Sequence, residues 1–179
     1  GNGMAPIPEL LAAGIRVGIG TDSMMTNNNL DLFEEMRQAS LVAKLRREDP
    51  AALPAWTVLE MSTIGGARAL GLADEIGTLE VGKRADLILV DLDRPHLWPL
   101  HRSQDSFGNL VEQLVFAARA SDVCATIVDG QILMLDGGFR TLDLEDVRET
   151  VQRQAGDLLR RAGAEEVVFD RLSRRELEG

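Results

Sequence analysis

Cysteine is almost absent from this chain of 179 residues, in which Cys124 stands alone. One cysteine cannot close an internal disulfide, so nothing in the sequence indicates an oxidising compartment, and we expect a cytoplasmic protein. Apolar runs of the ~18 to 20 residues that span a membrane are also lacking. The first residues, Gly1 to Met4, have neither the basic nor the apolar region of a secretory signal. The sequence thus predicts neither secretion nor a membrane partner.

Positive charge is scarce. Lysine and arginine number 19 against 29 aspartates and glutamates, which gives a net charge of −10 and a pI near 4.7. The arginines near the C-terminus alternate with acidic residues and form no single basic patch. An acidic chain without such a patch repels a phosphate backbone, so we expect no nucleic-acid partner.

Glycine and proline, at 17 and 6 residues, are too few for a low-complexity chain. Hydrophobic residues make up 45% of the chain and charged residues 27%, with a mean hydropathy of −0.05. These proportions are typical of a globular protein of one or one and a half domains.

Hydrophobic patterning predicts helices in the first half of the chain. Pro6 and Pro8 suit the first turn of a helix that Gly14 ends in a left-handed conformation. A second helix is expected over Leu30–Arg46, and Pro54 opens a third that leads into small residues. The residues expected to face inward from the second helix are Leu30, Phe33, Met36, Leu41 and Leu45.

Three regions predict β-strands. The β-branched run Ile15–Gly20 indicates a largely buried strand, and Leu87–Val90 indicates a shorter one. Val123–Val128 and Gln131–Leu135 flank Asp129-Gly130, a strong hairpin signal.

Two more helices are expected in the second half. One covers Leu110–Ala120, inside a connector between strands, with apolar residues at helical spacing. The other is the charged, amphipathic segment Leu144–Ala162, followed by a peripheral tail after Gly163.

Asp22 is the first candidate functional residue, because it directly follows the strand expected at Ile15–Gly20 and the polar Thr21. In α/β barrels the carboxyl ends of the strands carry the chemistry, and a carboxylate there binds a metal or moves a proton. An aspartate after Gly-Thr also caps helices and Asx turns. The residues alone leave both interpretations open.

The two histidines, His96 and His101, have four residues between them, a spacing found in zinc sites. Pro95 and Pro99 oppose the regular helix that would aim both rings at one ion, so we expect a solvent-facing connector there. Cys124 lies within a predicted strand, where a small buried side chain is expected and not a nucleophile. No G-x-G-x-x-G loop, Walker lysine pattern or G-x-S-x-G elbow occurs, so neither a nucleotide cradle nor Ser/His/Asp hydrolysis is expected.

Six stretches, taken together and in this order, resemble the amidohydrolase superfamily. They are Met4–Gly14, Val17–Asp22, Asn27–Asp31, Ala67–Leu72, Ile76–Ile88 and Val128–Gly130. Within the superfamily they are most similar to the branch of methylthioadenosine/S-adenosylhomocysteine deaminases, guanine and cytosine deaminases, and triazine hydrolases. The resemblance runs from about residue 3 to about residue 150, and its most specific part is Gly77 to Leu92.

The resemblance implies an α/β fold: the C-terminal part of a metal-dependent (β/α)8 barrel, part of a small composite β-sandwich, and a C-terminal helix. It places the last barrel strand and helices in residues 1–76 and a sandwich segment in 77–142, with a helical connector at 93–121. Residues 143–179 are then the C-terminal helix and tail.

The resemblance also implies an activity, hydrolysis of a C–N bond on a purine, pyrimidine or triazine-like ring. Asp22 is then the metal-ligating carboxylate of the eighth strand and the general base, while Ser23 and Thr26 shape the substrate pocket. The implied cofactor is zinc or iron, which lowers the pKa of a bound water toward ~7. Asp22 would take the proton of that water and pass it to the leaving group, with ammonia as the product.

The chain departs from the family in its histidines. The family takes a His-x-His pair and further histidines from earlier strands, whereas this chain has His96 and His101 in another region. One clear barrel strand cannot close a barrel of ~250 residues. We therefore expect the C-terminal portion of a longer enzyme, inactive and metal-free alone. Its expected partners are a small heterocyclic substrate and either further copies of itself or the missing N-terminal part. The alternative is a catalytically incomplete remnant or a self-associating structural fragment.

Overall fold

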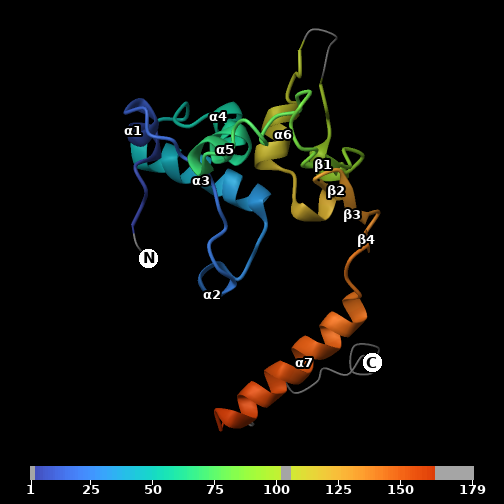
Figure 1. Ribbon diagram of the computed structural model, residues 1–179. Coiled ribbons are helices and arrows are strands. Elements are labelled where there is room, and N and C mark those ends of the chain that lie inside the picture. Colours follow the sequence, from blue (N-terminus) through green and yellow to red (C-terminus); the bar gives the residue numbers. More distant parts are fainter. Residues whose placement is uncertain (1–2, 102–105, 164–179) are drawn as a thin grey trace. The chain divides into compact units, whose positions relative to one another are not determined.

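The computed structural model describes residues 3–101 and 106–163 of the chain. The chain divides into two compact units, residues 1–138 and 139–179. In the first unit, helices come before a small sheet along the chain (Figure 1). The five helices that precede the sheet are α1 (Ile7–Ala12), α2 (Met24–Asn27), α3 (Leu32–Arg47), α4 (Ala55–Ser62) and α5 (Ile64–Leu70).

Local signals set the start of α1 and α3 and the end of α1. Pro6 precedes α1, and Gly14 follows it with a φ of +72°, as the sequence predicts. Asp31 caps α3, because its Oδ1 accepts hydrogen bonds from the backbone N–H groups of Phe33 at 2.9 Å and Glu34 at 3.4 Å. Both helices therefore begin where short-range chemistry favours it.

The buried face of α3 differs from the predicted one. Leu41 and Leu45 are 47% and 74% exposed, and Leu30 lies before the helix. Phe33 and Met36 are buried, as predicted, and Ser40 and Ala43 complete the buried face at spacings of three or four residues. The small side chains Ser40 and Ala43 allow the neighbouring elements to approach closely, and this decides which side of the helix is covered.

The strand predicted over Ile15–Gly20 is not formed. This segment belongs to no sheet, and Ile15 is 50% exposed. Val17 and Ile19 are half-buried against the core. A strand needs a hydrogen-bonded neighbour, and among the residues the structure describes none lies beside this segment.

The run of small residues after α4 allows close packing, as predicted. The single helix expected there is broken at Thr63 into α4 and α5. A Cβ on Gly65 would lie 3.3 Å from the carbonyl oxygen of Val17. The backbone of the segment Ile15–Gly20 therefore packs directly against the backbone at the start of α5.

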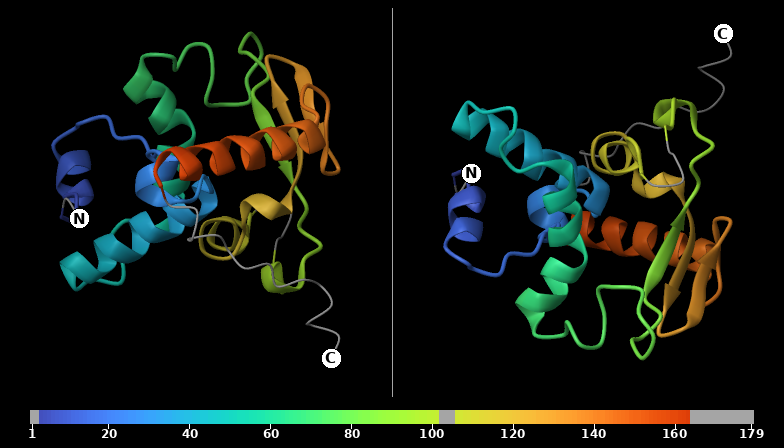
Figure 2. Two further views of the ribbon diagram at one scale, coloured as in Figure 1. Left: turned by 90° about the horizontal axis from the view of Figure 1, so that it is seen from below. Right: turned by 90° about the horizontal axis from the view of Figure 1, so that it is seen from above.

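The sheet has the strand order β1-β2-β3-β4. Its strands are β1 (Leu87–Val90), β2 (Val123–Val128), β3 (Gln131–Leu135) and β4 (Gly138–Phe139). β1 pairs antiparallel with β2, and β2 with β3, with Ile88 opposite Thr126 and Val128 opposite Gln131. Asp129 and Gly130 both have positive φ at the hairpin turn, as such turns require. Both views in Figure 2 show β1 beside this hairpin.

The connector between β1 and β2 contains η1 (Pro95–Leu97), α6 (Leu110–Phe116) and η2 (Ala120–Asp122). α6 ends four residues earlier than predicted, because the backbone N–H groups of Ala117 and Ala118 both turn back to the carbonyl of Gln113. The other oxygen of the Asp31 carboxylate, Oδ2, accepts the backbone N–H of Ala120 at 2.9 Å. One side chain thus caps α3 and holds the start of η2.

The core of the first unit lies where α3, α4 and α6 pack against one another. Leu97 of η1, Val58 of α4 and Val115 of α6 are fully buried there. The connector therefore contributes Leu97 and the inner face of α6 to the core.

The second unit contains α7 (Leu144–Arg161), close to the predicted bounds. The Oδ1 of Asp143 caps it by accepting the N–H groups of Glu145 at 3.0 Å and Asp146 at 3.3 Å. Across the described residues, no helix is long and apolar enough to cross a membrane.

Candidate functional site

Asp22 lies at the end of the extended segment, in a tight turn. Its φ is +58°, a left-handed backbone that costs most residues with a Cβ roughly 1–2 kcal/mol, although aspartate tolerates it better than most. Its Oδ1 accepts the backbone N–H of Ser23 at 2.8 Å, and the residue is exposed. Such backbone conformations concentrate at functional sites, where surrounding contacts hold them in place.

Ser23 and Thr26, the other two predicted site residues, meet on the first turn of α2. Their hydroxyl oxygens are 3.2 Å apart, and the Oγ1 of Thr26 donates to the carbonyl oxygen of Ser23 at 3.0 Å. Both side chains are exposed. The structure therefore brings Asp22, Ser23 and Thr26 together on one short, polar loop.

Asn27 and Glu35 belong to the same loop structure and were not predicted. The Nδ2 of Asn27 donates to the carbonyl oxygen of Thr21 at 2.8 Å and to the Oε1 of Glu35 at 2.5 Å. Asn29 adds a second connection, because its Nδ2 donates to Glu34 and its Oδ1 accepts the N–H of Asp31 at 2.9 Å. The run of three asparagines was the available signal, since asparagine side chains bond to nearby backbone in turns.

A metal site cannot be assembled from the described residues alone. Nowhere in ranges 3–101 and 106–163 do three histidine, cysteine, aspartate or glutamate side chains gather closely enough to hold an ion. Asp22 offers one carboxylate, whereas a tightly held zinc ion takes three or four protein ligands. The described residues therefore do not fit a complete metal centre, since Asp22 supplies a single carboxylate.

His96 makes a contact that the sequence did not reveal. Its Nε2 lies 2.9 Å from the Oδ2 of Asp122, a residue that is 3% exposed. Burial is the largest single influence and raises the pKa of Asp122. Hydrogen bonds from His96 and from the backbone N–H of Arg119 lower it, and so do the charges of His96 and Arg94. Together these lowering effects outweigh burial. The pKa of this carboxyl is accordingly held below its usual range. His96 is exposed, as predicted, but its ring also bonds to a buried carboxylate that the prediction did not include.

His101 and Cys124 have structural surroundings. The backbone N–H of His101 donates to the Oδ1 of Asn109 at 2.8 Å, and its carbonyl accepts the N–H of Asn109 at 3.0 Å. Cys124 is half-buried in β2, and its Sγ donates to the carbonyl oxygen of Leu89 at 3.4 Å. Among the residues that the structure describes, neither meets a partner that would activate it.

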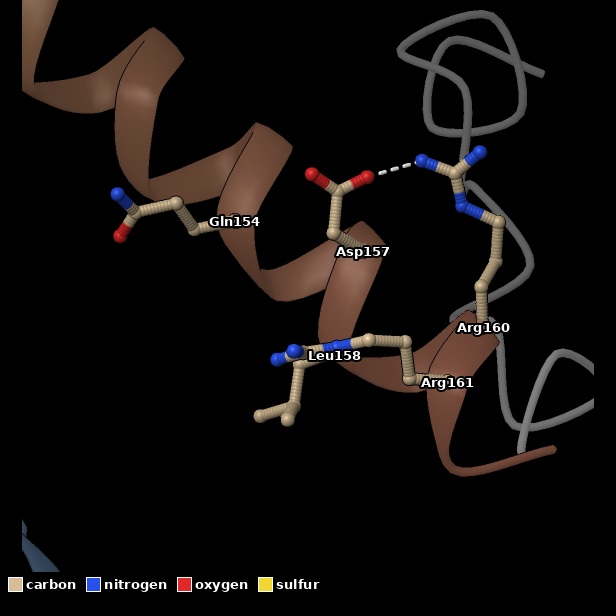
Figure 3. A pocket seen from close by; sticks show the side chains of 5 residues that line it. All are labelled: Gln154, Asp157, Leu158, Arg160 and Arg161. Atoms are coloured by element: carbon tan, nitrogen blue, oxygen red, sulfur yellow. Dashed lines mark hydrogen bonds and ion pairs between the residues drawn. The ribbon is translucent and has the colours of Figure 1, made fainter.

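Two hollows lie on the surface away from the Asp22 side chain. One lies beside the extended segment, has a volume of about 410 Å³, and is lined mainly by apolar residues that include Ile7, Ile19 and Met61. The other lies along α7, where Figure 3 shows the paired Asp157 and Arg160. All five labelled side chains of the second hollow come from a single helix, so the described residues offer no converging set of reactive groups there.

Comparisons with known proteins connect the Asp22 loop to a family. The model of the amidohydrolase family matches residues 1–133. The chain is 51% identical over 160 residues to the 5-methylthioadenosine/S-adenosylhomocysteine deaminase of Desulforudis audaxviator, covering 89% of this chain and 35% of that protein. It is 52% identical over 154 residues to the enzyme of the same description from Moorella thermoacetica, covering 86% and 34%. The chain thus spans about a third of the length of the curated relatives it matches.

Solved structures are similar to it as well. A crystal structure of an adenosine deaminase from Xanthomonas campestris with bound zinc matches with a TM-score of 0.80 and 37% identity, over 88% of this chain and 34% of that one. A zinc complex of atrazine chlorohydrolase from Arthrobacter aurescens matches with a TM-score of 0.69 and 29% identity, over 84% and 32%.

Proposed function

This chain belongs to the amidohydrolase family, and we propose that it is part of a deaminase that releases ammonia from the adenine ring of 5-methylthioadenosine or S-adenosylhomocysteine. The observation that carries the proposal is the near 50% identity to deaminases of that description, which extends through the Asp22 loop. Cleavage of other purine, pyrimidine or triazine rings is the broader class to which the reaction belongs.

The arrangement of elements supports a place for this chain in a larger fold. We propose that in the complete protein residues 1–76 form the last strand and helices of a (β/α)8 barrel, with Ile15–Gly20 pairing with a strand outside the described residues. Residues 77–142 would form a segment of a composite β-sandwich. The helix and tail would be residues 143–179. Exposed apolar side chains support the assignment: Ile15 is 50% exposed and Leu79 is 78% exposed, surfaces that a further part of the protein would cover.

In the proposed site, Asp22 is the group that moves protons. Its free Oδ2 would accept a proton from the attacking water and return it to the departing amino group, while Oδ1 keeps its bond to the Ser23 N–H. Ser23 and Thr26 would line the substrate pocket beside it. A zinc or iron ion in the same centre would activate water, with Asp22 as one of its ligands and the other ligands outside the described residues.

We also propose a cytoplasmic location, a small heterocyclic substrate and no nucleic-acid partner. The strongly acidic composition supports the absence of a nucleic-acid partner. Exposed apolar side chains support assembly with further copies or with the rest of the polypeptide.

One observation favours a second candidate function, a catalytically incomplete chain that acts through association. The described residues gather no group of metal ligands. Stoichiometric zinc or iron on the purified 179-residue chain would reject this candidate. Both candidates expect metal-free, inactive protein from this segment alone, so absence of turnover by the complete polypeptide is the result that favours the second.

The deaminase proposal is tested with the complete polypeptide that contains this segment. Purified protein should release ammonia from 5-methylthioadenosine or S-adenosylhomocysteine, and Asp22→Asn should abolish turnover while the protein stays folded by circular dichroism. Asp49→Asn, on an exposed loop outside the site, is the matched control and should keep its rate. Full deamination by Asp22→Asn would contradict the role given to Asp22.

A further inference from the structure

The backbone turn at Asp22 is held by the side chain of Asn27, which has no part in the chemistry proposed above. Residues Ile15–Gly20 belong to no sheet, so strand pairing does not fix the position of Asp22. Asp22 itself has a positive φ, a conformation that reverts unless its surroundings hold it. Packing of Val17 and Ile19 against the core holds the segment before Asp22, and contacts next to Asp22 add the constraint on its own backbone.

Asn27 supplies it from the other side of the loop. Its Nδ2 donates to the carbonyl oxygen of Thr21, the residue directly before Asp22, at 2.8 Å. The same amide nitrogen donates to the Oε1 of Glu35 at 2.5 Å. One –NH₂ group, which has two hydrogens to donate, thus connects the peptide before Asp22 to a helix.

Glu35 is a fixed point for that connection. It lies on the first turns of α3, between Phe33 and Met36, which are 8% and 4% exposed in the core. The Asp31 cap also holds the beginning of this helix. Glu35 is half-buried, and a hydrogen bond from an amide N–H to a carboxylate oxygen is of the stronger, charge-assisted kind.

We infer that Asn27 and Glu35 are positioning residues, which fix the carboxylate of Asp22 by tying the Thr21 peptide to α3. This inference rests on the proposed function for its catalytic meaning, whereas the tie itself is a property of this chain. Asn27 touches neither substrate nor reacting atoms in this role. It acts through the backbone conformation of Asp22.

The tie is tested first in the 179-residue chain. Hydrogen exchange of the Ser23 amide, which is bonded to Asp22 Oδ1, should accelerate about tenfold in Asn27→Ala and in Glu35→Ala, the factor that one charge-assisted hydrogen bond supplies. Glu35→Gln keeps an oxygen that can accept from Asn27 and should exchange within about twofold of the parent chain. Gln38→Ala is the matched control, since Gln38 is exposed on α3 and bonds to Glu34 instead.

The effect of the Asn27–Glu35 tie on catalysis is tested in the complete enzyme with 5-methylthioadenosine as substrate. Asn27→Ala and Glu35→Ala should lower kcat about tenfold to a hundredfold and change KM by less than about twofold, because misplacing a reacting group lowers turnover more than binding. Glu35→Gln should recover most of kcat. A residue with a merely structural role would instead lower the amount of folded enzyme and leave kcat per folded molecule unchanged.

The two arms separate the possible failures. Unchanged Ser23 exchange in Asn27→Ala overturns the inference, whatever the activity. Faster exchange with unchanged kcat also overturns it, because the turn would then not position a working group. If the parent enzyme does not deaminate, the proposed function fails, and the exchange arm alone decides whether Asn27 holds the Asp22 turn.

Discussion

The Cα of Gly66 occupies the space that a side chain on Gly18 would need, because a Cβ built on Gly18 would lie 2.9 Å from it. The neighbouring atom belongs to a helix backbone, which cannot move aside as a flexible side chain does. This contact joins the segment that leads to Asp22 to the start of α5.

Gly18→Ala should therefore destabilise the chain by about 1–3 kcal/mol, the cost of forcing an extra carbon into a packed contact. Gly20→Ala is the control: Gly20 lies on the same segment and a Cβ there meets nothing within 4 Å. Urea unfolding followed by circular dichroism measures both. Equal midpoints for the two variants would contradict the contact.

Ser40 predicts a second stability effect. It is fully buried, its Oγ donates to the carbonyl oxygen of Leu53 at 2.8 Å, and it accepts from the Nζ of Lys44 at 2.9 Å. Ser40→Ala leaves the buried carbonyl without its donor and should cost about 1–3 kcal/mol. Ser62→Ala removes a hydroxyl that bonds only to the carbonyl of Val58 in its own helix, so its unfolding free energy should change by less than about 0.5 kcal/mol.

The His96–Asp122 pair predicts a dependence of stability on pH. The pKa of Asp122 is below its usual range in the folded chain, whereas in the unfolded chain it returns to about 3.9. The unfolded state then binds more protons between these values, so this stabilisation is complete above about pH 4 and lost as the pH falls through the folded pKa. His96→Ala should raise that folded pKa and move acid unfolding to higher pH. His101→Ala should leave the acid limb of a pH titration, followed by tryptophan fluorescence, unchanged.

Glu9 predicts a directly measurable titration. A hydrogen bond from Arg46 is the largest cause that lowers the pKa of Glu9 to about 2, and Arg47 adds to it. Carboxyl carbon shifts measured by NMR should show Glu9 still ionised at pH 3. Arg46→Ala should raise its pKa toward 4.5, the ordinary value, whereas Arg37→Ala on the same helix should not. An unchanged Glu9 titration in Arg46→Ala would show that the pair does not form in solution.

Elements with local signals were predicted well from the sequence. The hairpin around Asp129-Gly130 and the helix from Leu144 are specified by residues adjacent to them, and the structure confirms both. The resemblance to amidohydrolases is likewise confirmed. It rests on short stretches of sequence in a fixed order, which can be read without knowing what packs against them.

Features that depend on distant partners were not predicted. The segment Ile15–Gly20 has the composition of a strand but lacks a neighbour to pair with, and the outer position of Leu45 is decided by what packs on α3. His96 and Asp122 are 26 residues apart, so no spacing rule connects them. The roles of Asp22, Ser23 and Thr26 remain predictions, although the structure places all three on one loop.

The two oxygens of Asp31 serve different parts of the first unit, one at the beginning of α3 and the other at the beginning of η2, from which β2 follows directly. No flexible linker separates these attachments, since a single rigid carboxylate makes both. A tilt at the start of α3, which also carries Glu35, would therefore be transmitted to the first residues of β2.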